Sequence, residues 1–411
     1  MQTSIRRGEY AELAVLFFIQ WMALGIWYVP LSPVLDAHGL HAIRPIAFAT
    51  AAIGALVSPL IFGAMADRHA SPVLVLRWLA AASAVTMTLA TWSIQHAWPA
   101  WLVVALIQAL MLSSTPITSI STSIVFSRLR DPKREFGPIR AIATFGWMCG
   151  CWLVSALNAD ASTLSGYLGS AIWLALSAFT FLLPATPPPP STGHVTWRER
   201  MGWDALVLLK NPNHRVVFIA AAIFSIPLSA FYPFTPPHLQ QLGLQHTTAW
   251  MTLGQVSEVI AMLGLAGLLA KWRLKWVFAT GLAVGVVRFA LCMVNSKVWV
   301  LAGVSLHGFS YTLYFITAQI YLDQRIDPAW RARAQALMSL MTSGIGSLLG
   351  YLGVGLWFSA CSSPVGTHWS LFWGGLSASV AVILAWFLAV YHGQGVGLRR
   401  QKPEAMPNLE G

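Results

Sequence analysis

Residues 247–269 read TTAWMTLGQVSEVIAMLGLAGLL, a stretch that is long enough and apolar enough to cross a membrane as one helix. It nevertheless contains Glu258 near its middle, three residues after Gln255, so the two side chains share one face of the helix. An ionisable group at the centre of a spanning helix costs about 3 kcal/mol, and such groups usually face a polar cavity. With the helix ends that the sequence indicates, Glu258 is the one central carboxylate among 14 acidic residues. We expect it to line a functional cavity, the alternative being a structural hydrogen-bond network between helices.

The composition indicates an integral membrane protein. Of its 411 residues, 56% are hydrophobic and 9% are charged, whereas soluble domains carry about 25% charged residues. The net charge of +11 does not indicate nucleic-acid binding, because the basic residues stand singly or in small groups between apolar stretches. The four cysteines have neither paired spacing nor histidine partners, so we expect no metal or other cofactor. The expected partners are membrane lipid and a small solute.

Apolar runs that can span a hydrocarbon core of about 30 Å recur along the chain. They occur at 11–34, 45–66, 72–95, 99–126, 138–158, 163–185, 215–237, 247–270, 275–295, 298–322, 335–359 and 367–391. The sequence therefore predicts an all-α membrane protein with twelve transmembrane helices.

Lysine and arginine predict the orientation of these helices. If the N-terminus is cytoplasmic, 20 of the 25 basic residues fall in inside segments, whereas Arg44 and Lys297 fall outside. Arg77, Arg140 and Arg288 remain within helices. By the positive-inside rule, both termini are expected in the cytoplasm.

The longest polar connection divides the chain into two halves of six helices. It contains the proline run 187–190 and an amphipathic segment at 203–209. We expect an N-terminal bundle at 1–186, a cytoplasmic linker at 187–213, a C-terminal bundle at 214–392 and a cytoplasmic tail at 393–411. The two halves contain a similar motif at equivalent positions, RLRDP at 128–132 and QRIDP at 324–328, which indicates an internal repeat. Duplicated bundles of this kind are typical of transporters that bind their substrate between the repeats and expose it to each side in turn.

One loop motif resembles that of a large superfamily of transporters. Residues 63–68, GAMADR, resemble the loop signature of the major facilitator superfamily, in which an acidic and a basic residue hold neighbouring helix ends together. The resemblance implies a gating or structural role for Asp67 and Arg68. We expect Asp131 and Asp327, from the repeated loop, to act in the same way. For Arg288 a structural role against helix-end carbonyls and a cavity role both stay open.

An ordered set of further stretches resembles the bacterial nucleoside:proton symporter family, the nucleoside permeases. These stretches are 20–27, Pro59 with Gly63, 138–140 with Thr144, 202–205 with 210–211, 255–258, 288–291 and 328–335. The resemblance implies a secondary transporter of the bacterial inner membrane that takes up nucleosides with protons by alternating access. It also implies that the protein is not an enzyme and, by analogy with the fold, that it works as a monomer.

The resemblance also implies which side chains line the substrate cavity. In the family, an arginine and a threonine of the fifth helix and a glutamine and a glutamate of the eighth do so, which here are Arg140, Thr144, Gln255 and Glu258. Trp147 stands where the family has an aromatic residue, and its spacing places it on the same helix face as Arg140 and Thr144. An alternative for Arg140 is that it extends toward the cytoplasmic interface.

Important positions depart from the family pattern. Thr312 stands where characterised nucleoside permeases have an aspartate, and Phe315 replaces an asparagine. Ser229 and Tyr232 replace two amide residues of the seventh helix. These departures leave open a second transporter hypothesis, in which the solute is a sugar or another small polar metabolite, imported or exported.

Other side chains complete the predicted site. Trp27, Trp147, Tyr232, Tyr311 and Phe315 could stack on a nucleobase. The predicted substrate-binding set is Arg140, Thr144, Trp147, Gln255, Glu258, Tyr232, Tyr311, Thr312, Phe315, Gln319, Gln20 and Trp27. Glu258 is the predicted proton-coupling residue, because removing a carboxylate from water favours its neutral form. We interpret His307 as a satisfied interhelical histidine near the outer surface in preference to a ligand.

Hypotheses from other classes have little support in the sequence. The chain contains no GxxxxGK, HExxH or GxSxG motif, which argues against an ATP-driven pump and against an embedded hydrolase. A receptor that does not transport is the remaining alternative.

Overall fold

The computed structural model describes residues 7–67, 70–129, 132–184 and 196–393. These residues are helical apart from their connections and one short antiparallel hairpin, formed by β1 (Ser362–Ser363) and β2 (Gly366–Thr367). The proline run 187–190, Arg68, Asp131 and the predicted tail beyond Gly393 lie outside the described residues, and the side chain of Asp67 is not described.

The first half of the chain forms seven α-helices. They are α1 (Arg7–Tyr28), α2 (Leu31–Ala37), α3 (Arg44–Asp67), α4 (Pro72–Gln95), α5 (Ala100–Arg128), α6 (Pro132–Ala156) and α7 (Leu164–Phe179), with a 3-10 turn, η1 (His41–Ile43), before α3. Proline opens α4 and α6, where its missing N–H costs no helical hydrogen bond.

The second half begins with two short helical segments, α8 (Trp197–Arg200) and η2 (Trp203–Lys210), and continues with longer ones. These are α9 (Pro212–Leu228), α10 (Phe231–Gln241), α11 (Thr247–Met251), α12 (Leu253–Lys271), α13 (Leu274–Met293), α14 (Lys297–Ser305), α15 (His307–Tyr311), α16 (Thr317–Arg325), α17 (Pro328–Ser339), α18 (Ser347–Ala360) and α19 (Trp369–Val390). Two π-helical segments, η3 (Thr312–Ile316) and η4 (Leu340–Gly346), continue α15 into α16 and α17 into α18. Such segments are rare and often lie at functional sites.

The predicted membrane spans are confirmed, with one difference in length. Among the described residues, 11 helical spans are long and apolar enough to cross a membrane. The remaining predicted span, the sixth in chain order at 163–185, is the 16-residue helix α7. It ends earlier than predicted because the backbone turns at Thr180. The fold is therefore an all-α membrane fold with the expected helices.

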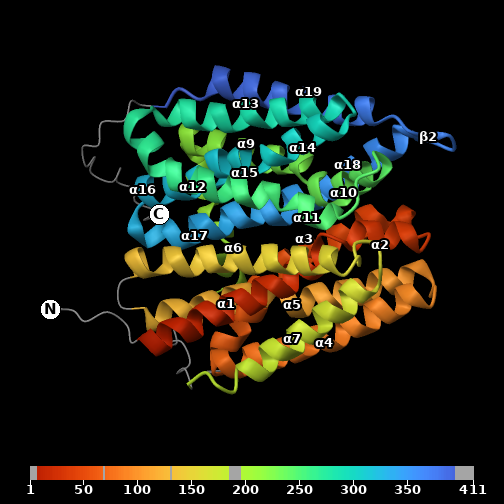
Figure 1. The fold of residues 1–411 in the computed structure, drawn as a ribbon. Helices are drawn as coiled ribbons and strands as arrows, with labels where there is room; N and C mark the ends of the chain where they lie inside the picture. Colours follow the sequence, from red (N-terminus) through yellow and green to blue (C-terminus); the bar gives the residue numbers. More distant parts are fainter. Residues whose placement is uncertain (1–6, 68–69, 130–131, 185–195, 394–411) are drawn as a thin grey trace.

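The helices gather into two bundles that lie against each other. In Figure 1 the red-to-yellow elements α1 to α7 form the lower layer and the green-to-blue elements α9 to α19 form the upper layer. Each layer has its own buried core, since one hydrophobic cluster is built from the first half with Tyr351 added, and another from the second half with Val29, Trp147 and Cys151 added. The bundles meet where α3 packs on α18 and η4, α6 on α11, and α2 on α10.

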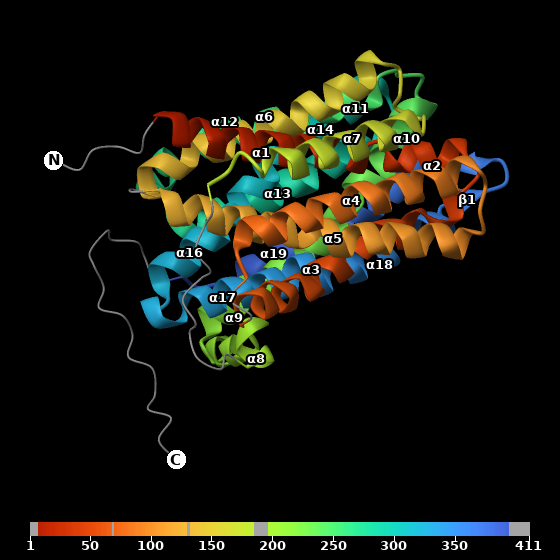
Figure 2. The ribbon, with the colours of Figure 1, turned by 90° about the horizontal axis from the view of Figure 1, so that it is seen from below.

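The two ends of the molecule differ in how the bundles meet. We call the end with α2, η1 and β1–β2 the hairpin end, and the opposite end, where α16 joins α17, the α16–α17 end (Figures 1 and 2). At the hairpin end, the Ser32 hydroxyl of α2 donates to the Pro233 carbonyl oxygen of α10 at 2.5 Å. The backbone N–H of Thr248 donates to Asp160 at 2.7 Å, and that of Ala249 donates to the Ser155 hydroxyl at 3.0 Å. These bonds join the first bundle to the second.

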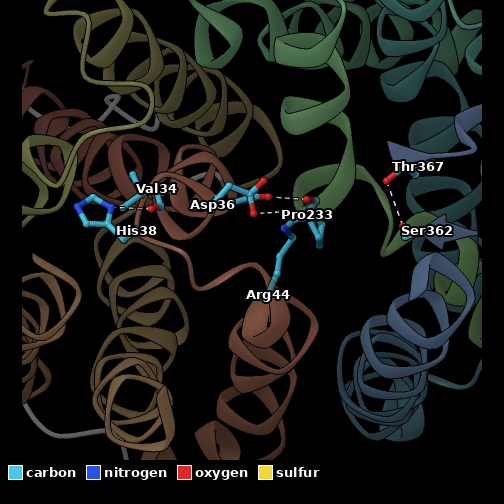
Figure 3. Close-up of polar contacts among 8 residues, drawn as sticks. Val34, Asp36, His38, Arg44, Pro233, Ser362 and Thr367 are labelled. Carbon is cyan, nitrogen blue, oxygen red and sulfur yellow. Dashed lines mark hydrogen bonds and ion pairs between the residues drawn. The ribbon is translucent and has the colours of Figure 1, made fainter. Parts of the chain in front are cut away.

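Arg44 connects the bundles at the same end. It lies at the start of α3, forms an ion pair with Asp36 and is almost fully buried (Figure 3). Its guanidinium carbon also lies 5.5 Å from the ring centroids of both Phe234 in α10 and Phe358 in α18, which belong to the other bundle. A cation over aromatic faces is attracted to both, so Arg44 holds three elements together.

The connection before α9 docks on α17. Thr196 and Glu199 form a capping box at the start of α8, and Arg333 of α17 pairs with Glu199 at 3.1 Å. The hydrogen bond from the Thr196 backbone, aided by its hydroxyl and by Arg333, lowers the pKa of the Glu199 carboxyl.

The amphipathic segment predicted at 203–209 is the 3-10 helix η2. At the next repeat loop, Asp327 caps α17 by accepting a hydrogen bond from the Ala329 N–H at 2.9 Å.

Candidate functional site

A cavity of about 350 Å³ lies between the two bundles. Its walls come from α1 and α6 of the first bundle and from α9, α10, α12, α15, η3 and the α16-to-α18 region of the second. Gln319 of α16 and Gln335 of α17 line its part nearest the α16–α17 end, and the Gln335 amide donates to the Gln319 carbonyl oxygen at 2.9 Å. The cavity thus extends toward the end where fewer polar bonds join the bundles among the described residues.

Most of the predicted binding residues meet in this cavity. Those that line it are Arg140, Thr144, Trp147, Tyr232, Gln255, Glu258, Tyr311, Phe315 and Gln319. They come from six helical segments that are far apart in the sequence. The structure therefore brings together side chains that the sequence could place only on separate helix faces.

The charged groups of the cavity come from opposite bundles. Arg140 of α6 donates to the Thr144 hydroxyl at 3.3 Å, and its guanidinium carbon lies 4.1 Å from the ring centroid of Trp21 in α1. Glu258 of α12 lines the other side, and its carboxyl interacts electrostatically with Arg140. Arg140 thus faces the cavity and does not extend along α6 toward the helix end. A solute between the two groups would meet a donor on one side and an acceptor on the other.

Aromatic rings form much of the remaining wall. Tyr232 of α10 lies between bundles, with ring centroids 5.9 Å from Trp147 and 5.2 Å from Tyr28. The Gln255 amide donates to the Tyr232 hydroxyl at 3.2 Å, while Gln255 Oε1 and Trp147 Nε1 are buried without a partner among the described residues. Buried polar atoms are normally paired, so these two atoms are available to a solute or to water.

A second aromatic group lines the wall formed by the second bundle. The rings of Tyr311 and Phe315 stack at 5.2 Å, and the rings of Phe231 and His307 stack at 3.7 Å with an interplanar angle of 5°. Flat stacked rings offer a surface on which a planar heterocycle can lie.

A hydroxyl-rich wall was not predicted from the sequence. It consists of Ser339, Thr342, Ser343 and Ser347 around η4, together with Ser225 and Ser229 of α9. The spacing of the first four residues, i, i+3, i+4 and i+8, is a polar stripe on an otherwise apolar span and could have indicated a cavity face. Trp21, Leu228, Phe231, Met338 and Tyr351 also line the cavity without having been predicted.

Three predicted residues lie outside the cavity lining. Gln20 is buried inside the first bundle, where its amide donates to the Thr118 hydroxyl at 3.1 Å and accepts from Ser121 at 2.5 Å. Trp27 belongs to the core of the same bundle. Thr312 is fully buried in η3. Its neighbour Tyr311 reaches the cavity, because one residue along a helix turns the side chain by about 100°.

His307 of the aromatic wall is paired with Arg288, which lies behind it. Arg288 of α13 is buried, and its Nη1 lies 2.6 Å from Nδ1 of His307. Its guanidinium carbon lies 5.0 Å from the Phe231 ring centroid and 4.6 Å from that of Phe289. His307 has the interhelical partner that was expected for it, and it also lines the cavity, whereas Arg288 does not.

Comparisons with known proteins identify chains and a fold that are similar to this one. The chain is 32% identical over 403 residues to the putative nucleoside transporter YegT of Escherichia coli, covering 93% of both chains. It is 25% identical over 407 residues to the nucleoside permease NupG of the same organism, covering 92% of this chain and 95% of NupG. A crystal structure of a NupG variant superposes with a TM-score of 0.87 at 23% identity, covering 93% of this chain and all of that one. The family model described as nucleoside H+ symporter matches residues 8–394. The resemblance seen in the sequence is thereby confirmed, and the chain is a multi-pass membrane protein that belongs to the nucleoside H+ symporter family.

Proposed function

We propose that this protein takes up nucleosides together with protons across the bacterial inner membrane, by alternating access of the cavity to the two sides. The observation that carries the proposal is the cavity between the bundles, in which Arg140 and Glu258 face the same space from opposite halves. A site at the interface of two helical repeats can be opened to either side when one bundle rocks against the other.

The lining suits a solute with an aromatic part and a hydroxylated part. The stacked rings of Tyr311 and Phe315 offer a face to a nucleobase. The hydroxyl oxygens around η4 offer acceptors to a ribose, since the hydroxyls of Thr342 and Ser347 already donate to backbone carbonyl oxygens. A volume of about 350 Å³ falls at the lower end of the range for small-molecule sites, roughly 300–1,000 Å³. The cavity therefore accommodates one nucleoside-sized molecule.

Glu258 is the group that we assign to proton coupling. Glu258 lies near the middle of the apolar span Thr247–Lys271, and the permanently charged Arg140 lines the other side of the cavity. When the carboxyl is protonated, Arg140 is free to bind a solute. When it is ionised, it competes for the same guanidinium. Solute and proton occupancy are thus linked through one residue pair.

The division of the chain and its orientation form part of the proposal. The moving parts are the bundles 1–186 and 214–392, the connection 187–213 lies in the cytoplasm, and the tail 393–411 follows there. Arg325, Arg331 and Arg333 lie at the α16–α17 end, which supports placing this end in the cytoplasm. The polar bonds at the hairpin end then close the outer side, and the cavity that reaches Gln319 and Gln335 is open toward the cytoplasm. Because one chain encloses the whole cavity, we propose a monomer as the transport unit.

The test is uptake of labelled uridine by the purified protein in liposomes, with and without an imposed pH gradient. We expect accumulation when the outside is acidic and simple equilibration without the gradient. Uridine uptake that is saturable yet unaffected by the gradient would contradict the proton coupling. Absence of uptake in both conditions would contradict nucleoside transport.

A second candidate solute is a sugar or related polyhydroxy compound. The observation that favours it is the hydroxyl wall of Ser225, Ser229, Thr342 and Ser343, which presents more groups than a ribose alone would occupy. Direct uptake of labelled sugars in the same liposomes separates the two, because uptake of a labelled sugar without uptake of labelled uridine would favour the second candidate.

A further inference from the structure

We infer that His307 presents its Nε2–H to the cavity as a fixed hydrogen-bond donor for an acceptor on the nucleobase, and that Arg288 is the positioning residue that fixes this state. The inference rests on the proposed function and deepens it, because it names the feature of the base that the cavity recognises.

The tautomer of His307 follows from the chemistry of its partner. The Arg288 guanidinium carries only donors, and its Nη1 lies 2.6 Å from His307 Nδ1. The ring nitrogen at this contact must therefore accept the hydrogen bond and carries no proton. A neutral imidazole with an unprotonated Nδ1 has its proton on Nε2. Only the second nitrogen is left to donate.

The orientation of the ring is fixed as firmly as its tautomer. Phe231 stacks on the imidazole at 3.7 Å between centroids and 5° between planes, and the same phenyl ring lies 5.0 Å from the Arg288 guanidinium carbon. His307 is 8% exposed and Arg288 is 2% exposed, so neither side chain is free to reorient in solvent. The next residue, Gly308, donates its N–H to the Ser257 hydroxyl at 3.0 Å, which anchors the start of α15 on α12. Rigid placement of this kind makes a donor selective.

The donor lies on the side of the cavity suited to a base. His307 is in the lining, and its ring is nearly parallel to that of Tyr311 at 6.3 Å, which in turn stacks on Phe315. A heterocycle lying along these rings would present its edge, and not its face, to an N–H that projects in the ring plane of His307. The edge atoms of nucleobases that accept such a bond are carbonyl oxygens and unprotonated ring nitrogens.

Arg288 is not used by the transport mechanism proposed above, because it does not line the cavity. Its Nε has no partner among the described residues, and its guanidinium contacts the His307 nitrogen and two aromatic rings. Burying a guanidinium costs free energy unless the group is compensated, so such a position needs a reason. Fixing the donor of a cavity histidine provides that reason.

The experiment compares two substitutions of His307 that keep different nitrogens. His307→Asn keeps an acceptor that Arg288 can reach but has no group at the position of Nε2. His307→Gln keeps an amide donor near that position but loses the contact with Arg288. Both are tested as competition against labelled uridine uptake, using nucleosides and analogues that lack one acceptor. The pairs are adenosine with its 1-deaza, 3-deaza and 7-deaza analogues, in each of which a C–H replaces one ring-nitrogen acceptor.

We expect the parent protein to prefer the natural member of at least one pair by about twofold to twelvefold, the range for one neutral hydrogen bond. His307→Asn should reduce that preference to less than twofold, whereas His307→Gln should retain only part of it, because its donor is no longer fixed by Arg288. A merely structural role would alter uptake of both members equally and leave the ratio unchanged. Ratios in His307→Asn that equal those of the parent for all three pairs would overturn the assignment.

Two further measurements keep the result interpretable. Size-exclusion profiles report whether each variant is folded. If His307→Asn is not, His307→Phe, which keeps the stack on Phe231 without any donor, is expected to lose the same preference. The parent arm tests the proposed function separately. Without uridine uptake by the parent, nucleoside transport fails and the inference fails with it. With uptake and unchanged ratios, only the role of His307 fails.

Discussion

Tyr28 of α1 and Tyr351 of α18 share a hydrogen bond of 2.8 Å between their hydroxyl oxygens. The bond joins the two bundles beside the cavity, because Tyr351 is part of its lining and the Tyr28 ring packs on Tyr232 at 5.2 Å. A contact between the bundles of this kind exists only while they are close together, so it favours the conformation that is closed at the hairpin end.

Replacing Tyr28 with phenylalanine should shift the protein toward opening at that end. A neutral hydrogen bond contributes roughly 0.5–1.5 kcal/mol, equivalent to about a twofold to twelvefold change in the conformational equilibrium. The measurement is the rate at which a membrane-impermeant maleimide modifies a cysteine placed at the buried Ser32 position, in a background without the four native cysteines. Tyr351→Phe should raise the rate to the same extent, and the double variant no further. Additive effects of the two changes would show that the hydroxyls act independently.

The Arg44 contact predicts a second change at the hairpin end. Arg44→Lys keeps the charge next to Asp36 but loses the planar group that lies over Phe234 and Phe358, at about 0.5–1 kcal/mol for each ring. Labelling at position 32 should become faster. Arg77→Lys is the matched control, since Arg77 also lies over a ring, that of Phe181, but within one bundle. Equal acceleration by both substitutions would mean that Arg44 does not act between the bundles.

Glu258→Gln should separate exchange from accumulation. The amide keeps the size and hydrogen-bonding capacity of the side chain but cannot take up or release a proton. Solute exchange between the two sides of a liposome membrane should persist. Accumulation driven by a pH gradient should fall to the level measured without a gradient. The measurement is counterflow and gradient-driven uptake of labelled uridine in the same preparation. Undiminished accumulation by the variant would assign proton coupling to another group.

Gly308→Ala should destabilise the folded protein. A Cβ at Gly308 would meet the backbone nitrogen of Glu258, which is not able to move without displacing α12. Overpacking of this kind costs about 1–3 kcal/mol. Gly264→Ala in α12, where a Cβ meets no atom within 4 Å, is the control and should leave stability unchanged or slightly higher. Thermal unfolding followed by tryptophan fluorescence in detergent gives both values. Equal melting temperatures would show that α15 can shift to make room.

The membrane-spanning helices could be predicted from the sequence, because the membrane sets the length and hydropathy of each helix separately. The sequence also indicated Glu258, whose charge in the middle of an apolar span suggests a cavity, whereas Arg140 and Gln255 were placed in that cavity through the resemblance to the family. Gln20 shows the limit of this reasoning. It is as polar as Gln255, but it satisfies its amide within the first bundle, and its neighbour Trp21 is the residue of α1 that reaches the cavity.

The second bundle held features that local pattern could not provide. The π-helical turns η3 and η4 change which side chains face inward, so Thr312 is buried while Phe315 reaches the cavity. The pairing of His307 with Arg288 depends on the approach of α15 to α13, which no spacing within either helix encodes. The serine and threonine stripe around η4, by contrast, was visible in the sequence and carried information about the cavity.

The bonds that close the hairpin end have a consequence for how fast the protein can work. Ser32, Thr248 and Ala249 all donate to oxygen atoms of the opposite bundle, and each of these groups regains an equivalent bond from water once separated. Such an exchange changes the free energy by only about 1 kcal/mol per bond. The hydrogen bonds at the hairpin end can therefore break one after another as water enters, without a single high barrier. A weakly bound solute is then enough to shift the equilibrium between the conformations that are closed and open at this end. Turnover need not be limited by the opening of the hairpin end.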